Sequence, residues 1–148
     1  MPVPAVVLSP DCHHLLVRPW LDPLVDPLGH DPRGAYVERF WLGVLGPSVS
    51  FFLRYVAERL DAAPDGFDLD LAACASALGL GRFSGRTNAF PRTLTRCCQY
   101  RVARLVNGVT LEVRRKLPPL SPTRVANLSE ALRQEHERWI ARAVESAG

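Results

Sequence analysis

Apolar residues recur at helical spacing along much of the chain. A helix is expected over residues 47–62, where apolar positions separated by three or four residues alternate with charged ones. The apolar positions are Val49, Phe52, Leu53, Val56 and Leu60. Pro47 suits the first turn of this helix, and the turn sequence at 62–66, AAPDG, is expected to end it.

Two more helices are predicted after this turn. A helix rich in small residues is expected from Leu71 to Leu78, with Asp68 or Asp70 as its N-cap and the following glycines as its end. A loop should follow, and then a helix over residues 89–101 with Asn88 as its cap.

A short extended segment is expected at Phe67 and Leu69, and a longer pattern typical of strands follows the helices. Two runs rich in β-branched residues flank Asn107-Gly108, which is the strongest short signal for a β-hairpin. A two-residue turn would place Arg104 among the apolar residues on one face of the hairpin. Either Arg104 then lies at the edge of the sheet, or the register differs from this one. The apolar residues of that face are Val102, Val106, Val109, Leu111 and Val113.

The two ends of the chain differ in pattern. Residues 1–34 contain seven of the thirteen prolines and are expected to form an arm packed on the body, with a short strand near residues 6–8. Residues 35–148 are expected to form one domain. Its last part begins at Ser121-Pro122, a capped helix start, and Asn127 with Glu130 suggests a capping box for the final helix. That helix has an apolar side comprising Val125, Leu128, Leu132, Trp139, Ile140 and Ala143.

The charges are distributed unevenly along the chain. The formal net charge is only +3. Residues 82–116, however, contain nine basic side chains and a single acidic one, Glu112. A field of this kind is what a polyanion would bind, although a solvated basic surface explains it equally well.

The order of the predicted elements resembles a winged helix-turn-helix domain of the bacterial regulator type over about residues 47–120. The residues that carry the resemblance are LDLAACASALGLG and NAFPRTLTRCCQYR as the helix pair and RVARLVNGVTLEVRR as the wing. The resemblance implies a mainly α fold with a small β-hairpin, to which this chain adds a proline-rich N-terminal arm and a C-terminal helix. It also implies a bacterial transcriptional regulator in which helix 89–101 lies in the major groove of duplex DNA. The Gly79–Asn88 connection is longer than the turn in compact members of the family.

A helical projection identifies candidate DNA-binding residues. With Leu94 and both vicinal cysteines turned toward the core, the opposite side of helix 89–101 should carry Arg92, Arg96 and Gln99. Together with Thr93 and Thr95 beside them, these side chains are candidates to read DNA. Residues of the loop and of the 101–116 hairpin are candidates for phosphate contacts: Arg82, Arg86, Arg104, Arg114, Arg115 and Lys116. RNA stays open as an alternative to DNA. A protein-interaction or scaffold module on the same fold is the alternative function.

The cysteines and histidines do not form a recognisable reactive site. Cys97 and Cys98 lie beside each other among cationic residues that could lower a thiol pKa, but neighbours in a helix point apart, so core packing is the favoured interpretation. Cys12, His13 and His14 have no second ligand cluster, and no catalytic motif is present. We therefore expect no enzymatic activity, no cofactor and no metal. The longest apolar run, residues 40–53, is too short to span a membrane, which predicts a cytoplasmic protein. A homodimer through the C-terminal helix is a further expectation.

Overall fold

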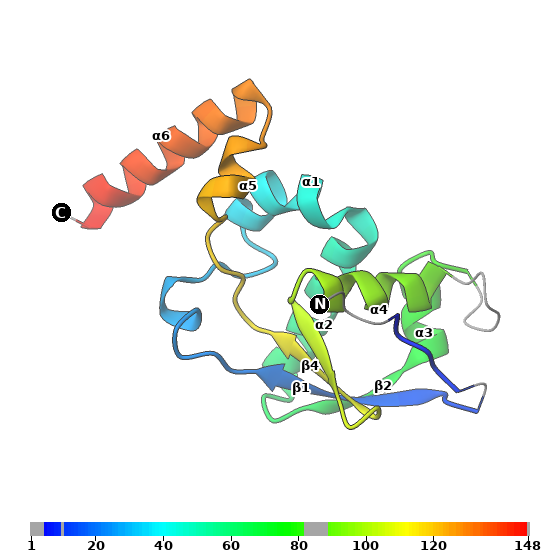
Figure 1. Ribbon diagram of the computed structural model, residues 1–148. Helices are drawn as coiled ribbons and strands as arrows, with labels where there is room; N and C mark the ends of the chain where they lie inside the picture. The colour runs from blue at the N-terminus through cyan, green and yellow to red at the C-terminus, as the bar shows by residue number, and fades with distance from the viewer. Residues whose placement is uncertain (1–4, 10, 82–88, 148) are drawn as a thin grey trace.

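A four-stranded sheet forms one side of the molecule. The computed structural model describes residues 5–9, 11–81 and 89–147. The strands lie in the order β2-β1-β4-β3 (Figure 1). Their bounds are His14–Trp20 for β1, Phe67–Asp70 for β2, Ala103–Val106 for β3 and Thr110–Arg114 for β4. β1 runs antiparallel to β2 and parallel to β4, so a strand from the N-terminal region lies inside the sheet.

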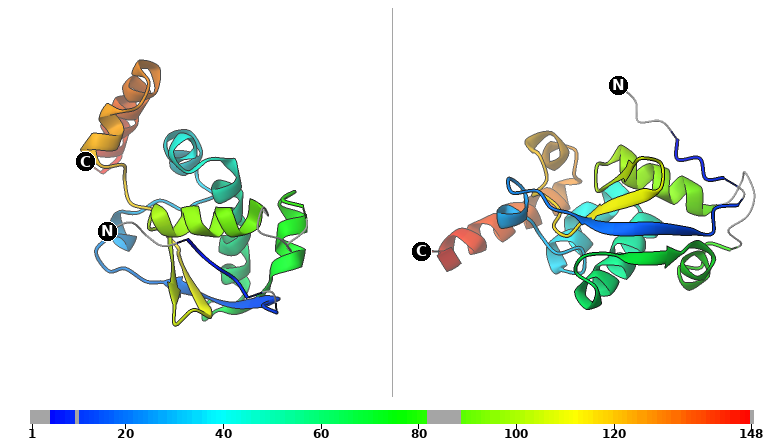
Figure 2. Two further views of the ribbon diagram at one scale, coloured as in Figure 1. Left: turned by 45° about the vertical axis from the view of Figure 1, so that its right-hand side comes forward. Right: turned by 90° about the horizontal axis from the view of Figure 1, so that it is seen from below.

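Helices cover one face of this sheet, while no helix of the described residues lies on the opposite face (Figures 1 and 2). The longer helices of this layer are α2 (Pro47–Ala62), α3 (Leu71–Ala77) and α4 (Ala89–Gln99). Before them lie the 3₁₀ turn η1 (Asp26–Leu28), the π-helical turn η2 (Val37–Trp41) and the short α1 (Leu42–Leu45). The mainly helical fold with a small sheet agrees with the expectation from sequence, although the sheet extends beyond a hairpin.

Several helix starts and caps predicted from the sequence are confirmed. Pro47 occupies the start of α2, directly after Gly46, which has a positive φ of 84°. The carboxylate of Asp70 caps α3 by accepting a hydrogen bond from the backbone N–H of Ala73 at 3.0 Å. The side chain of Ser121 caps the short helix α5 (Pro122–Ala126). The predicted cap of α4, Asn88, lies outside the described residues.

The hairpin turn is confirmed, but its register is not the two-residue one. Asn107 and Gly108 both have positive φ, as the turn requires. Val106 nevertheless pairs with Thr110, so Val109 is an additional residue in the connection and is exposed. The shift places Arg104 opposite Glu112, on the face of the sheet away from the helices. The misfit of Arg104 in the simpler register is thereby resolved.

Two expectations about the ends of the chain are wrong. The N-terminal strand comprises His14–Trp20 and not residues 6–8, because the alternation of buried Leu15 and Val17 with exposed neighbours suits a sheet position despite Pro19. The final helix α6 (Glu130–Ala147) is capped by Ser129, whose hydroxyl accepts a hydrogen bond from the Leu132 N–H at 3.3 Å. Asn127 instead ends α5.

α6 is attached to the body through its first half and projects away from it (Figures 1 and 2). Buried His136 contacts the hydroxyl group of Tyr36 at 2.8 Å, and the same hydroxyl accepts a hydrogen bond from the Leu120 N–H. Trp139 packs edge-on against Tyr36 and Phe40. Beyond Trp139, the described side chains of the helix are all exposed.

Candidate nucleic-acid interface

The exposed side of α4 is basic. Its inward side contributes buried Phe90, Leu94 and Cys97 to the core, as the apolar spacing predicts. The exposed residues on the other side include Arg92, Arg96 and Gln99, and the helix has no acidic residue. A protein surface of this composition can donate hydrogen bonds to phosphate or to the edges of bases.

Arg96 lies beside aromatic residues that extend this surface. Its guanidinium donates a hydrogen bond to the carbonyl oxygen of Leu45 at 3.1 Å, and it lies 5.8 Å from the centre of the Tyr100 ring. Arg124 of α5 lies 5.4 Å from the same ring. Among the described residues, no carboxylate is within salt-bridge distance of Arg96 or Arg124. We call Arg92, Arg96, Gln99, Tyr100 and Arg124 the α4 surface.

Arg124 was not among the residues predicted from sequence. It lies in a separate helix, and only the packing of α5 against the end of α4 and Trp41 brings it to this surface. No spacing rule within the sequence connects residues 96 and 124, so the sequence held no signal for it.

Thr93 and Thr95 do not belong to the exposed side of α4. Thr93 is buried, and its hydroxyl donates to the carbonyl oxygen of Ala89 at 3.0 Å. The hydroxyl of Thr95 donates to the carbonyl oxygen of Pro91 and accepts the N–H of Val6 at 2.8 Å. Both hydroxyl groups are therefore used within the chain, the first in the core and the second under the N-terminal segment.

Two of the hairpin arginines lie in a layer on the outer face of the sheet. Arg114 bonds Asp22 at 2.9 Å and the carbonyl oxygen of Arg101 at 2.7 Å, and its guanidinium lies 3.8 Å from the centre of the Trp20 ring. Arg104 bonds Glu112 at 2.6 Å and lies 4.3 Å from the same ring. The hydrogen bond from Arg114 holds the pKa of Asp22 below its ordinary value. These contacts neutralise both arginines within the chain.

Arg115 belongs to a second ion network. It bonds the carbonyl oxygen of Ala57 at 2.9 Å and the carboxylate of Asp61, which Arg33 also contacts. The hydrogen bond from Arg33, and to a smaller extent that from Arg115, lowers the pKa of Asp61 to about 2. We call Arg104, Arg114 and Arg115 the paired arginines.

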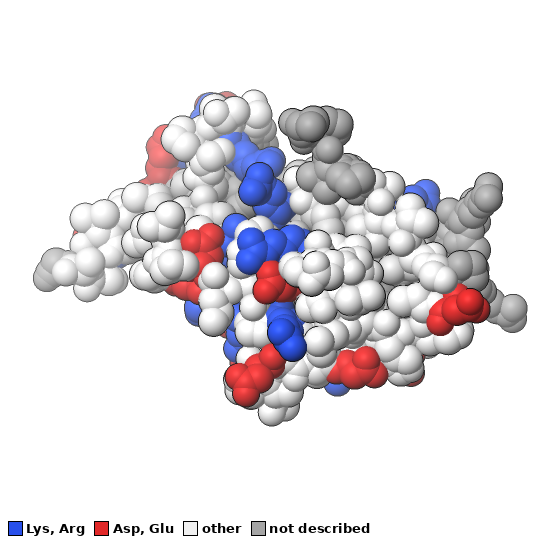
Figure 3. All heavy atoms as spheres, turned by 60° about the horizontal axis from the view of Figure 1, so that its bottom comes forward, with Lys and Arg blue, Asp and Glu red and all other residues white. Residues whose placement is uncertain are grey.

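The remaining residues predicted to contact phosphate belong neither to the α4 surface nor to the paired arginines. Lys116 is half-buried beside Gly29, where an added Cβ would come within 2.5 Å of the Cβ of Lys116. Arg82 and Arg86 lie outside the described residues. Figure 3, a view that brings the lower side of the molecule in Figure 1 forward, shows Lys and Arg side chains in a band with Asp and Glu beside them. The positive charge counted in the sequence is therefore partly cancelled in the folded chain.

The cysteines are core residues. Cys74, Cys97 and Cys98 are all buried and free. Burial raises the pKa of the Cys74 thiol to about 12 and also raises the pKa of Cys98, in spite of the arginines nearby. A thiolate at neutral pH is therefore disfavoured at these positions, as the preferred interpretation of the sequence expected.

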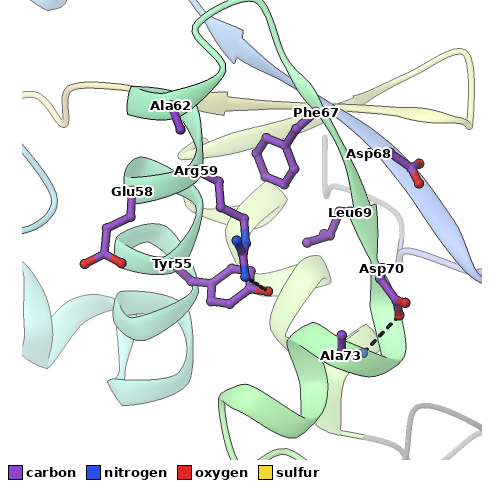
Figure 4. A pocket seen from close by; sticks show the side chains of 9 residues that line it. All are labelled: Tyr55, Glu58, Arg59, Ala62, Phe67, Asp68, Leu69, Asp70 and Ala73. Atoms are coloured by element: carbon purple, nitrogen blue, oxygen red, sulfur yellow. Dashed lines mark hydrogen bonds between the residues drawn. The ribbon is translucent and has the colours of Figure 1, made fainter.

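A pocket of about 460 Å³ lies between α2, β2 and α3 (Figure 4). Arg59 lies over the ring of Tyr55 inside it, at 4.1 Å from the ring centre. Asp70 on its rim is used as the cap of α3, and Asp68 bonds His14 at 2.7 Å. The pocket contains no nucleophile paired with a base, so it gives no basis for a catalytic site.

No protein-family model, curated protein or solved structure matches the chain. Within residues 5–9, 11–81 and 89–147, no three His, Cys, Asp or Glu side chains are grouped so as to hold a metal ion. No helix in the described part of the chain has the length and apolar character needed to cross a membrane.

Proposed function

We propose that the protein is a DNA-binding transcriptional regulator of the winged-helix type, with α4 as the helix that enters the major groove. The order α2, β2, α3, α4, β3, β4 supports this proposal, because it is the order of helices and hairpin in that family. The position of β1 between β2 and β4 adds one strand to the three that the hairpin and β2 supply.

The observation that carries the proposal is the composition of the α4 surface. Arg92, Arg96 and Gln99 are exposed on one side of a helix without acidic residues. Arginine can bond guanine or phosphate in bidentate fashion, and glutamine can bond adenine. Arg124 adds a second guanidinium beside Arg96, from a different helix.

The paired arginines have a different place in this proposal. Because Arg104, Arg114 and Arg115 bond carboxylates of the same chain, we assign them to the fold and not to phosphate contact. The proposed interface is therefore smaller and more concentrated on α4 than the charge of residues 82–116 indicates.

A salt titration of binding to a labelled duplex of mixed sequence tests the proposal. If the three arginines of the α4 surface contact phosphate, raising the salt from about 50 to 200 mM should weaken binding by about 40-fold, because condensed counterions are released on binding. The Arg92→Ala/Arg96→Ala double variant should bind about 100-fold more weakly at low salt.

The matched control is the Arg138→Ala/Arg142→Ala double variant, which removes the same charge from the exposed side of α6. It should retain most of the affinity. Equal losses in the two double variants would show a nonspecific charge effect, and undetectable binding by the unmodified protein at low salt would refute the proposal.

A protein partner is the second candidate, and the free half of α6 favours it. Ile140 is 43% exposed and Val144 is 66% exposed, on the same side of a helix that extends beyond the body. A second copy of this chain is the partner we propose, in line with the expected homodimer. Light scattering should show a dimer that Ile140→Glu/Val144→Glu converts to a monomer, whereas a monomeric unmodified protein would refute it.

A further inference from the structure

A cleft of about 570 Å³ lies beside the free edge of β3, apart from the α4 surface. It is lined by residues of the N-terminal segment, the end of β1, the end of α4 and β3: Ala5, Val6, Val7, Trp20, Cys98, Arg101, Ala103, Arg104 and Leu105. Clefts of this volume are typical of sites for small molecules.

The interior of the cleft is apolar. Trp20, Cys98 and Ala103 are buried core residues, and Leu105 is half-buried. Burial raises the pKa of the Cys98 thiol, so this group lies in the cleft without charge.

The rim of the cleft has one positive charge in excess. Arg104 is balanced by Glu112 and the adjacent Arg114 by Asp22. Arg101 is exposed, and among the described residues no carboxylate lies within salt-bridge distance of it. Its backbone is held at a φ of 58° by the turn after α4, and its carbonyl oxygen accepts the bond from Arg114.

The N-terminal segment closes the cleft on one side. The N–H of Val6 is anchored to the hydroxyl of Thr95, which fixes the segment against α4. The cleft therefore has an apolar interior, a wall held by a hydrogen bond and, among the described residues, one uncompensated cation at its mouth. Such a site suits a ligand with an apolar body and one anionic group.

We infer that this cleft binds an amphipathic organic monoanion, with its apolar body between Val6 and Leu105 and its carboxylate or sulfonate group at Arg101. The site does not depend on DNA binding, since Arg101 lies beyond the end of α4 and the α4 surface contributes none of the lining residues.

Two fluorescent probes with the same aromatic body test the inference. Anilinonaphthalene sulfonate carries the anionic group, and phenylnaphthylamine lacks it. The folded protein should bind one molecule of the sulfonate, and more tightly than the uncharged probe. Arg101→Gln should weaken sulfonate binding by about five- to tenfold and leave the uncharged probe unchanged, because only the charged hydrogen bond is lost.

The control variant is Arg59→Gln, which removes an exposed arginine from the pocket between α2, β2 and α3 and should change neither affinity. Amide and indole N–H chemical shifts measured by NMR give the position of the probe, and changes are expected at Val6, Val7, Ala103 and Trp20. Binding that does not saturate at one molecule would overturn the inference. So would equal effects of the two variants, or shifts confined to the pocket of Figure 4.

Discussion

Arg96 and Arg124 of the α4 surface have surroundings opposite to those of the paired arginines. Arg114 has a side chain only 10% exposed, bonded to a carboxylate and stacked on Trp20. Arg96 is exposed and bonds a backbone carbonyl instead, with no described carboxylate close to it. The comparison shows that a count of basic residues overstates the charge available to a polyanion, because ion pairing within the fold consumes part of it.

The largest effect is expected on the thermal stability of the protein when a paired arginine is removed. Arg114→Ala removes the partner of Asp22 and one of the two guanidinium groups over Trp20. We expect the midpoint of thermal unfolding, followed by circular dichroism, to fall by about 6–9 °C. Arg138→Ala on exposed α6 is the control and should change it by about 1 °C or less. Equal midpoints for the two variants would show that Arg114 stabilises the fold no more than an exposed arginine does.

A smaller effect is expected for Arg124→Ala, on affinity and not on stability. Arg124 contributes to the α4 surface without a described salt bridge, so its loss should weaken duplex binding by about fivefold in a fluorescence anisotropy titration. The unfolding midpoint should change little. If the variant were destabilised but bound the duplex with unchanged affinity, Arg124 would stabilise the fold, as the paired arginines do, and would not contact DNA.

The second ion network should make stability depend on acid pH. The pKa of Asp61 is about 2 in the folded protein, below the ordinary value near 4, so the unfolded chain takes up the proton first as pH falls. The stabilisation is complete above about pH 4 and is lost between about pH 4 and pH 2. Asp61→Asn should therefore be less stable than the unmodified protein at pH 6, and this difference should disappear toward pH 2.

Thermal unfolding scans at several pH values measure this difference. Asp65→Asn, at an exposed position with no described salt bridge, provides the matched control and should track the unmodified protein. A difference for Asp61→Asn that persists at pH 2 would mean that its carboxylate does not stabilise the network through its charge.

The smallest expected effect concerns Thr95. Its hydroxyl is used by Pro91 and Val6, so Thr95→Val should change DNA affinity by no more than about twofold while preserving the shape of the side chain. An anisotropy titration beside the Arg92→Ala/Arg96→Ala variant measures this. A tenfold loss would show that Thr95 contacts DNA and that the N-terminal segment moves away on binding.

Features of the fold that depend on a few adjacent residues could be predicted from the sequence. The caps at Asp70 and Ser121, the helix start at Pro47 and the positive φ values at Asn107-Gly108 all follow from local backbone chemistry. The exposed positions of Arg92, Arg96 and Gln99 follow equally from the helical repeat.

Features that depend on contacts between distant segments could not be predicted. The partner of Arg114 is Asp22, and the residue that covers Thr95 is Val6, and neither pairing has a local signature. Strand β1 was obscured by the prolines around it, since proline is compatible with a strand only where its missing N–H is not needed. The exposed side chains of the proposed DNA-binding helix could therefore be predicted from the sequence. The residues that cover Thr95 or form ion pairs with the hairpin arginines could not.

The inner position of β1 has a consequence for how the chain acquires its structure. Leu16 pairs with Thr110, so the middle of the sheet forms only when two segments from opposite ends of the domain meet. Contacts of this kind slow folding, because a large loop must close before any pairing is gained. During synthesis, residues 14–20 leave the ribosome first and remain without their β4 partner until residues 110–114 have emerged. We expect the pairing of β1 with β4 to limit the folding rate. A substitution that weakens β1 should therefore slow folding while leaving the surface of the folded protein unchanged.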